Sequence, residues 1–157
     1  LLVWAQNSGR LEPIIPLLRQ RVEKLSDVAP LISYFFSGPV SITPESFSHC
    51  KLAPVDACRA LQFALWKLEA LGTWNRDEVE SALMKLAEVL DIKVRDFLAP
   101  LFVAISGQPV SLSVIDSIAV IGLDLSRARL RIAIETLGGI SKKQAKNLEK
   151  EFAQLGQ

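Results

Sequence analysis

Apolar residues recur along this chain every three or four positions, which is the spacing of an amphipathic α-helix. Leu61, Leu65 and Leu68 form one such stripe, and Val79 and Leu83 begin a second one. Strand-like alternation of apolar and polar residues does not persist for more than a few positions. The pattern therefore predicts an all-α fold.

Capping residues, prolines and glycines divide the chain into eight predicted helices. These helices are expected at about 13–25, 27–36, 54–71, 76–91, 93–105, 112–121, 127–137 and 142–155. The predicted N-terminal caps are Ser26, Ser111 and Ser126, together with capping boxes formed by Asn75 with Glu78 and by Ser141 with Gln144.

The segment 37–53 is rich in serine and proline and contains one predicted short turn after Thr43. It is the best candidate for a domain boundary. We expect a small N-terminal helical subdomain at residues 1–41 and a larger helical bundle at residues 42–157.

The composition indicates an ordered protein. Half of the 157 residues are hydrophobic, and 18 Lys+Arg against 17 Asp+Glu leave a net charge of only +1, which excludes a disordered chain. The longest uncharged stretch, 97–115, is interrupted by Pro100, Gly107 and Pro109, which argues against a membrane span. We expect no contact with a membrane.

The residues that carry enzyme chemistry are scarce. The chain has two cysteines, Cys50 and Cys58, and one histidine, His49, too few for a tetrahedral zinc site. The cysteine pair is typical of reduced thiols in a cytosolic protein. No phosphate-binding or dinucleotide-binding glycine motif is present. We therefore expect no catalytic residue, no metal and no cofactor in this chain.

Charge is uneven along the sequence. Residues 77–96 are rich in acids, and residues 127–150 carry seven Lys and Arg against two Glu. Local basic faces in a nearly neutral chain suit a module that adds to a larger nucleic-acid contact made elsewhere. Solvated helix faces are the alternative interpretation.

Three segments, in this order, carry a family resemblance. They are RVEKL at 21–25 followed by YFF at 34–36, LGTW at 71–74 followed by VESAL at 79–83, and PLFVAISG at 100–107 followed by Ser111. Their order and spacing resemble the C-terminal anticodon-binding region of bacterial-type glutamyl-tRNA synthetases. The resemblance covers about residues 10–137.

The resemblance implies an all-helical, two-part cage that grips the anticodon loop of tRNA(Glu). The family enzyme attaches glutamate to tRNA with ATP and Mg²⁺ in a catalytic domain, which we expect upstream of Leu1. We also expect a cytoplasmic and monomeric protein. A paralogue that charges tRNA(Gln) and a helical protein-interaction domain without an RNA role are the alternatives.

In that family an arginine reads the third anticodon base, and it falls on Arg21. Glutamate anticodons end in C, whose O2 and N3 accept hydrogen bonds from a guanidinium that can only donate. Glutamine anticodons end in G, which presents donors instead. If Arg21 were only a solvated cation on a helix, this selectivity would not depend on it.

The family arginine that contacts the first anticodon base is replaced by Phe102, which can stack on a base or pack into the core. By position, Ser106, Ser111 and Val114 are further RNA-binding candidates. Tyr34 and Phe36 are candidates for base stacking. Lys142 and Lys143 are candidates for an RNA contact by the last helix.

Overall fold

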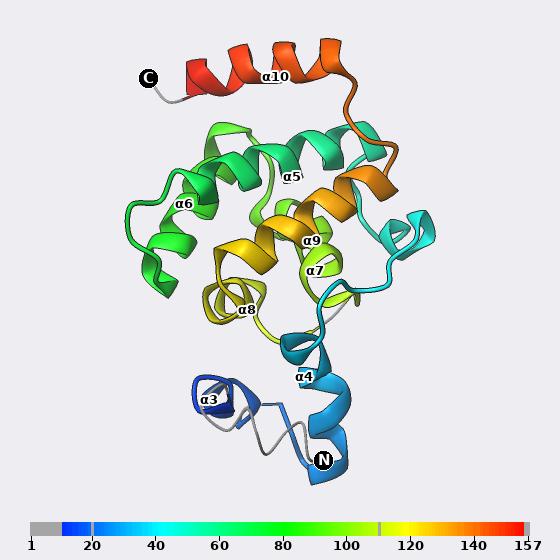
Figure 1. Ribbon diagram of the computed structural model, residues 1–157, viewed down its shortest axis with the longest axis vertical. Helices are drawn as coiled ribbons and strands as arrows, with labels where there is room; N and C mark the ends of the chain where they lie inside the picture. The colour runs from blue at the N-terminus through cyan, green and yellow to red at the C-terminus, as the bar shows by residue number, and fades with distance from the viewer. Residues whose placement is uncertain (1–10, 20, 110, 156–157) are drawn as a thin grey trace.

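The computed structural model describes residues 11–19, 21–109 and 111–155. Over these residues the fold is all-α, as predicted, with eight α-helices, two short 3₁₀ helices and no strand (Figure 1). The elements are α3 (Ile15–Leu18), η1 (Leu25–Asp27), α4 (Val28–Phe36), η2 (Pro44–Phe47), α5 (Pro54–Glu69), α6 (Arg76–Val89), α7 (Val94–Ser106), α8 (Val114–Ile121), α9 (Leu123–Thr136) and α10 (Lys142–Leu155). None of the described helices is both long and apolar enough to cross a membrane.

Helix α7 is the centre of the bundle. It packs against α4, α5, α6, α8 and α9, and its residues Phe97, Leu101 and Ile105 are almost entirely buried. Removing these side chains from water is the main source of stability for such a fold. Helix α7 therefore forms a common core with these five helices.

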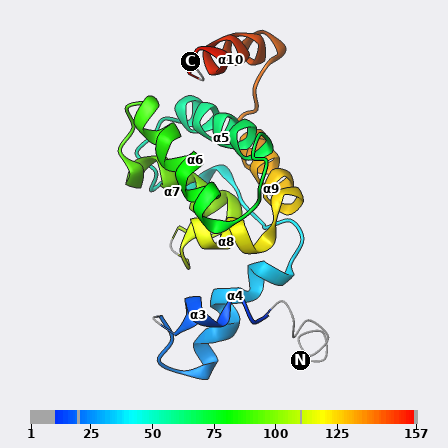
Figure 2. The same ribbon diagram turned by 90° about the vertical axis from the view of Figure 1, so that its left-hand side faces the viewer.

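The first and the last of the described helices lie at opposite ends of the molecule (Figures 1 and 2). Helices α3 and α4 lie at one end, and α10 lies at the other, across α5. The Phe152 ring of α10 packs 5.4 Å from the Phe63 ring and 5.3 Å from the Trp66 ring of α5. Arg59 Nε donates to Glu151 over 2.9 Å beside these rings.

Several predicted boundaries are confirmed. Asn75 Oδ1 accepts from the Glu78 backbone N–H over 2.9 Å at the start of α6. Ser141 and Gln144 form both bonds of the predicted capping box, over 2.9 and 3.3 Å. Gly107 ends α7 with a φ of 74°, a left-handed conformation that glycine adopts without strain.

The first predicted helix, 13–25, is wrong in length. The helix α3 ends at Leu18, and the backbone N–H groups of Arg21 and Val22 both donate to the Leu18 carbonyl in a turn. Residues 19–24 contain one apolar residue, Val22, so no apolar stripe is available to hold a longer helix on the core.

Three predicted caps are also wrong. Ser113, not Ser111, caps α8 by accepting from the Asp116 backbone N–H. Ser126 lies inside α9, because Gly122 turns the chain within one residue and the helix begins at Leu123. Ser26 lies in η1 and bonds to the carboxylate of Asp27 instead of capping α4.

The segment 37–53 packs closely on the bundle. Phe47 is buried, Val40 and Ile42 pack against the core, and a Cβ placed on Gly107 would lie 3.3 Å from the Val40 Cβ. The division into residues 1–41 and 42–157 stays a prediction. Residues 1–10 and 156–157, which belong to these two predicted parts, lie outside the described residues.

Candidate nucleic-acid interface

Three segments that are distant in sequence meet at one cavity of about 290 Å³. We call this cavity the basic groove. Its lining residues are Arg21, His49, Lys51, Arg95, Asp96, Ala99, Phe102, Pro109 and Ser111.

Each wall of the basic groove comes from a different part of the fold. Arg21 belongs to the turn after α3, and Lys51 to the connection between η2 and α5. Arg95, Ala99 and Phe102 belong to α7, where spacings of four and three place them on one helix face. Helix α7 thus forms the base of the groove, and the turn after α3 and the connection between η2 and α5 form its sides.

The groove is positively charged. It contains Arg21, Lys51 and Arg95 against one carboxylate, that of Asp96. Lys51 Nζ lies 3.3 Å from Asp96 Oδ1, so this pair is neutral as a whole. Among the described residues, Arg21 and Arg95 form no salt bridge, and their charges remain available to an anionic ligand.

Phe102 gives the groove an apolar wall. Its side chain is half-buried, packs against the hydrophobic core and lines the cavity. Its side chain therefore contacts both the core and the cavity, and a stacking role for its ring stays a prediction. An aromatic ring beside guanidinium groups is the combination on which single-stranded nucleic acids stack and bind.

Comparisons with known proteins show the family of the chain. The family model described as the anticodon binding domain matches residues 1–134. The chain belongs to this family. The resemblance found in the sequence is thereby confirmed.

The chain is similar in sequence to glutamate–tRNA ligases. The chain is 52% identical to a glutamate–tRNA ligase from Marinomonas sp. over 97% of its length, and 49% identical to one from Saccharophagus degradans over its full length. It spans about 31% of each of these relatives. A crystal structure of a glutamate tRNA ligase from Elizabethkingia meningosepticum has the same fold, with a TM-score of 0.74 at 21% identity, over 86% of this chain and 27% of that one.

Within this anticodon binding domain, the groove unites three of the predicted site residues, Arg21, Phe102 and Ser111. Sequence analysis did not select Lys51 or Arg95 as site residues. The spacing of seven between Arg95 and Phe102 on a predicted helix was a signal that could have found Arg95. Lys51 had no such signal, since it lies in a loop.

The other predicted residues near the groove serve the fold. Tyr34 is buried, and its hydroxyl bonds to Ser117 Oγ over 2.7 Å. Ser106 is buried and donates to the Phe102 carbonyl over 2.8 Å. Val114 is buried, and Phe36 is half-buried and packs against the core. None of these four lines the basic groove.

Lys142 and Lys143 are exposed on α10, at the opposite end of the molecule from α3 and α4 (Figure 1). They therefore cannot line the same groove as Arg21. Part of the basic region that precedes them is already neutralised, because Arg127 Nε lies 2.8 Å from Glu69, and Arg131 also pairs with that carboxylate.

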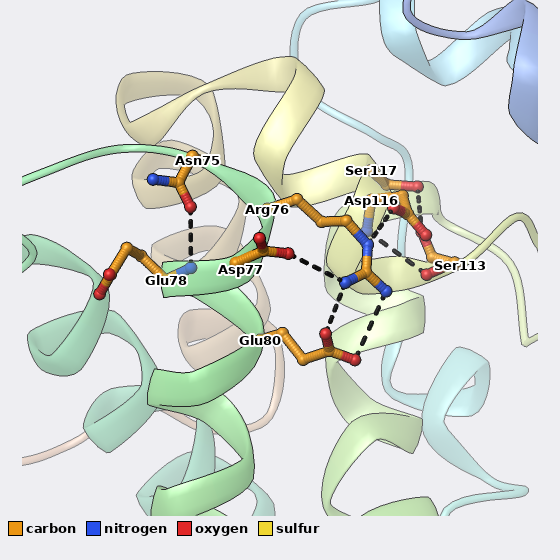
Figure 3. Close-up of polar contacts among 8 residues, drawn as sticks. All are labelled: Asn75, Arg76, Asp77, Glu78, Glu80, Ser113, Asp116 and Ser117. Atoms are coloured by element: carbon orange, nitrogen blue, oxygen red, sulfur yellow. Dashed lines mark hydrogen bonds and ion pairs between the residues drawn. The ribbon is translucent and has the colours of Figure 1, made fainter.

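Arg76 connects two helices of the bundle on the surface. Figure 3 shows its guanidinium between Glu80 of α6 and Asp116 of α8. Nη1 lies 2.5 Å from Glu80 and Nε lies 2.9 Å from Asp116. Hydrogen bonds to Glu80 and Asp116 raise the pKa of Arg76. The cluster thus links α6 at the surface to α8, the helix whose Ser117 bonds to Tyr34.

His49 lines the groove, and Cys50 follows it in the chain. The Cys50 Sγ lies 3.8 Å from His49 Nε2. Burial raises the pKa of the Cys50 thiol, whereas a nucleophilic cysteine needs a lowered pKa.

Proposed function

We propose that this chain is the anticodon-reading part of a glutamate–tRNA ligase and that the basic groove binds the anticodon loop of tRNA(Glu). The observation that carries the proposal is the meeting of Arg21, Arg95 and Phe102 in one cavity. Guanidinium groups bind phosphates and base edges, and an accessible ring face stacks with an unpaired base. Both are needed to hold a splayed loop.

In this proposal Arg21 selects the third base of the anticodon. Cytosine presents the acceptors O2 and N3, which match a guanidinium, whereas guanine presents N–H donors at the same edge. Donor would then face donor, and each buried group left unpaired costs about 1–3 kcal/mol. The parent protein should therefore prefer tRNA(Glu) to tRNA(Gln).

Phe102 and Ser111 contribute to the other side of the loop. Phe102 stacks on a splayed base where the family has an arginine, and Ser111 borders the same cavity. Tyr34, Phe36, Ser106 and Val114 support the walls through core contacts. Lys142 and Lys143 contact a different part of the tRNA, since they lie at the far end of the molecule.

The whole protein would use ATP and Mg²⁺ in a catalytic domain. Within the described part of this chain, no three His, Cys, Asp or Glu side chains are grouped to hold a metal ion. Both cysteines are free thiols, which supports a reducing compartment such as the cytoplasm. We propose that the protein acts there as a monomer.

The direct test is Arg21→Gln in the full-length protein, with charging of tRNA(Glu) and tRNA(Gln) compared. Arg19→Gln is the matched control, because Arg19 is exposed on the same segment but does not line the groove. We expect Arg21→Gln to reduce the preference for tRNA(Glu) by about 10- to 100-fold, and Arg19→Gln to leave it nearly unchanged. Equal discrimination by both variants would remove Arg21 from the mechanism.

The replacement of the family arginine by Phe102 supports one second candidate, a paralogue that charges tRNA(Gln). The same assay separates the two candidates, since the paralogue would prefer tRNA(Gln) before any substitution.

A further inference from the structure

Arg129 is a buried arginine whose hydrogen-bond partners are all backbone carbonyls. Its relative exposure is 0%, and it lies in the middle of α9. Nη1 donates to Ile105 over 2.5 Å, and Nη2 donates to Tyr34 over 2.5 Å and to Ser37 over 2.8 Å. Nε and Nη2 both donate to Gly38, over 3.1 and 3.0 Å.

These carbonyls belong to the ends of two helices. Tyr34, Ser37 and Gly38 form the C-terminal end of α4, and Ile105 lies in the last turn of α7. The last carbonyls of a helix have no donor within the helix and carry the negative end of its dipole. A guanidinium satisfies them and has its charge balanced there without a carboxylate.

The group remains charged under ordinary conditions. Burial lowers the pKa of Arg129 to about 10, which is still well above neutral pH. The guanidinium of Arg129 therefore keeps all five of its N–H donors, and no neutral side chain of similar length could offer as many.

The two helices that Arg129 joins are connected to two different sides of the basic groove. Ile105 lies three residues after Phe102 on α7, which also carries Arg95. The other end of α4 leads back through η1 to Arg21. Arg129 itself does not line the groove.

We propose that Arg129 is a positioning residue that fixes the Arg21 side of the basic groove relative to Phe102. The selectivity part of this inference rests on the function proposed above. Arg129 touches no nucleotide; it acts through the carbonyls of α4 and α7. Tyr34 reinforces this joint, because its hydroxyl ties α4 to Ser117 of α8.

A purely structural role predicts something different. An arginine that only stabilises the bundle would, when replaced, lower the melting temperature and leave the folded molecules with unchanged groove geometry and selectivity. A positioning residue changes the geometry and selectivity of molecules that are still folded. The test must therefore measure the geometry and selectivity of those molecules that remain folded.

The first measurement needs no RNA. Spin labels at Ser33→Cys on α4 and Ser81→Cys on α6, both exposed positions, report the placement of α4 on the bundle in the full-length protein with its native cysteines replaced. We expect a narrow distance distribution in the parent protein and a broad or shifted one in Arg129→Met and, to a smaller degree, in Tyr34→Phe. Arg131→Met is the control on the same helix, since Arg131 is exposed, and it should keep the narrow distribution.

The second measurement is binding of anticodon stem-loops that end in C or G, well below the melting temperature of each variant. We expect Arg129→Met to lose about tenfold of the preference for C, and Arg21→Gln to have little further effect in that background. Unchanged distances and unchanged preference in folded Arg129→Met would overturn the inference. If Arg129→Met does not fold, the same two measurements are made on Arg129→Lys and Tyr34→Phe. Label distances and a preference for C equal to those of the parent in both variants would also overturn the inference.

The two measurements separate this inference from the proposed function. A parent protein without preference for C would refute the proposed function, while the label distances would still show whether Arg129 places α4.

Discussion

The Tyr34 hydroxyl lies 2.7 Å from Ser117 Oγ, although the two residues are 83 positions apart. Ser117 also donates its own proton to the Ser113 carbonyl over 2.7 Å. Tyr34 is therefore the donor in the bond that joins α4 to α8. The neutral phenol supplies the proton of this bond.

This bond predicts a pH dependence of stability. Burial raises the pKa of Tyr34 above its ordinary value of 10.0, so the folded protein holds the phenol proton more tightly than the unfolded chain. The contribution of the buried, neutral Tyr34 phenol to the free energy of unfolding is complete below pH 10. It is lost as the pH rises further, because Tyr34 of the unfolded chain ionises first. Urea denaturation of the parent and of Tyr34→Phe should show a free-energy difference that is constant below pH 10 and then declines. A difference that stays constant to pH 11 contradicts this assignment.

A second prediction concerns salt. If Arg95 contacts a phosphate, Arg95→Gln should lower the slope of log affinity for the anticodon stem-loop against log salt by about 0.7. Lys51→Gln should have a smaller effect, because Lys51 is paired with Asp96 in the free protein. Lys150→Gln, on exposed α10, is the control and should leave the slope unchanged. Equal slopes for all of these variants would place the phosphate contacts elsewhere.

A third prediction isolates the ring of Phe102. Phe102→Leu keeps a half-buried apolar side chain but removes the stacking face, so affinity for the stem-loop should fall by about 1–3 kcal/mol. The melting temperature should change little by comparison. If affinity is retained while stability falls, Phe102 serves the core alone.

The fourth prediction tests the surface cluster of Figure 3. A double-mutant cycle with Arg76→Gln and Asp116→Asn should give a coupling free energy below about 1 kcal/mol, since the guanidinium is largely exposed and screened by solvent. The coupling should shrink further in high salt. A large coupling that resists salt would show that the pair is shielded from water in solution.

Much of the fold could be predicted from the sequence, because helical periodicity and local capping are properties of neighbouring residues. The capping bonds of Asn75 and Ser141 depend on residues three positions away, and both were found. Ser111 and Ser126 failed as caps for a tertiary reason: each is buried, and a nearby residue, Ser113 or Gly122, sets the helix start.

The candidate site was only partly predictable. Arg21, Phe102 and Ser111 came from the family resemblance, while Lys51 joins them only through the folding of a loop onto α7. Periodicity could have added Arg95, whose position on α7 matches that of Phe102. No local pattern shows that Tyr34 bonds to Ser117, since their contact depends on how two helices pack.

Arg129 donates only to backbone carbonyls, so these hydrogen bonds do not depend on the chemistry of the side chains at the acceptor residues. Any amino acid at the exposed position 37 offers the same carbonyl, and a side chain added at Gly38 would meet no atom within 4 Å. Homologous chains can therefore diverge at these two acceptor positions and still keep the geometry of the decoding surface, provided that the guanidinium persists.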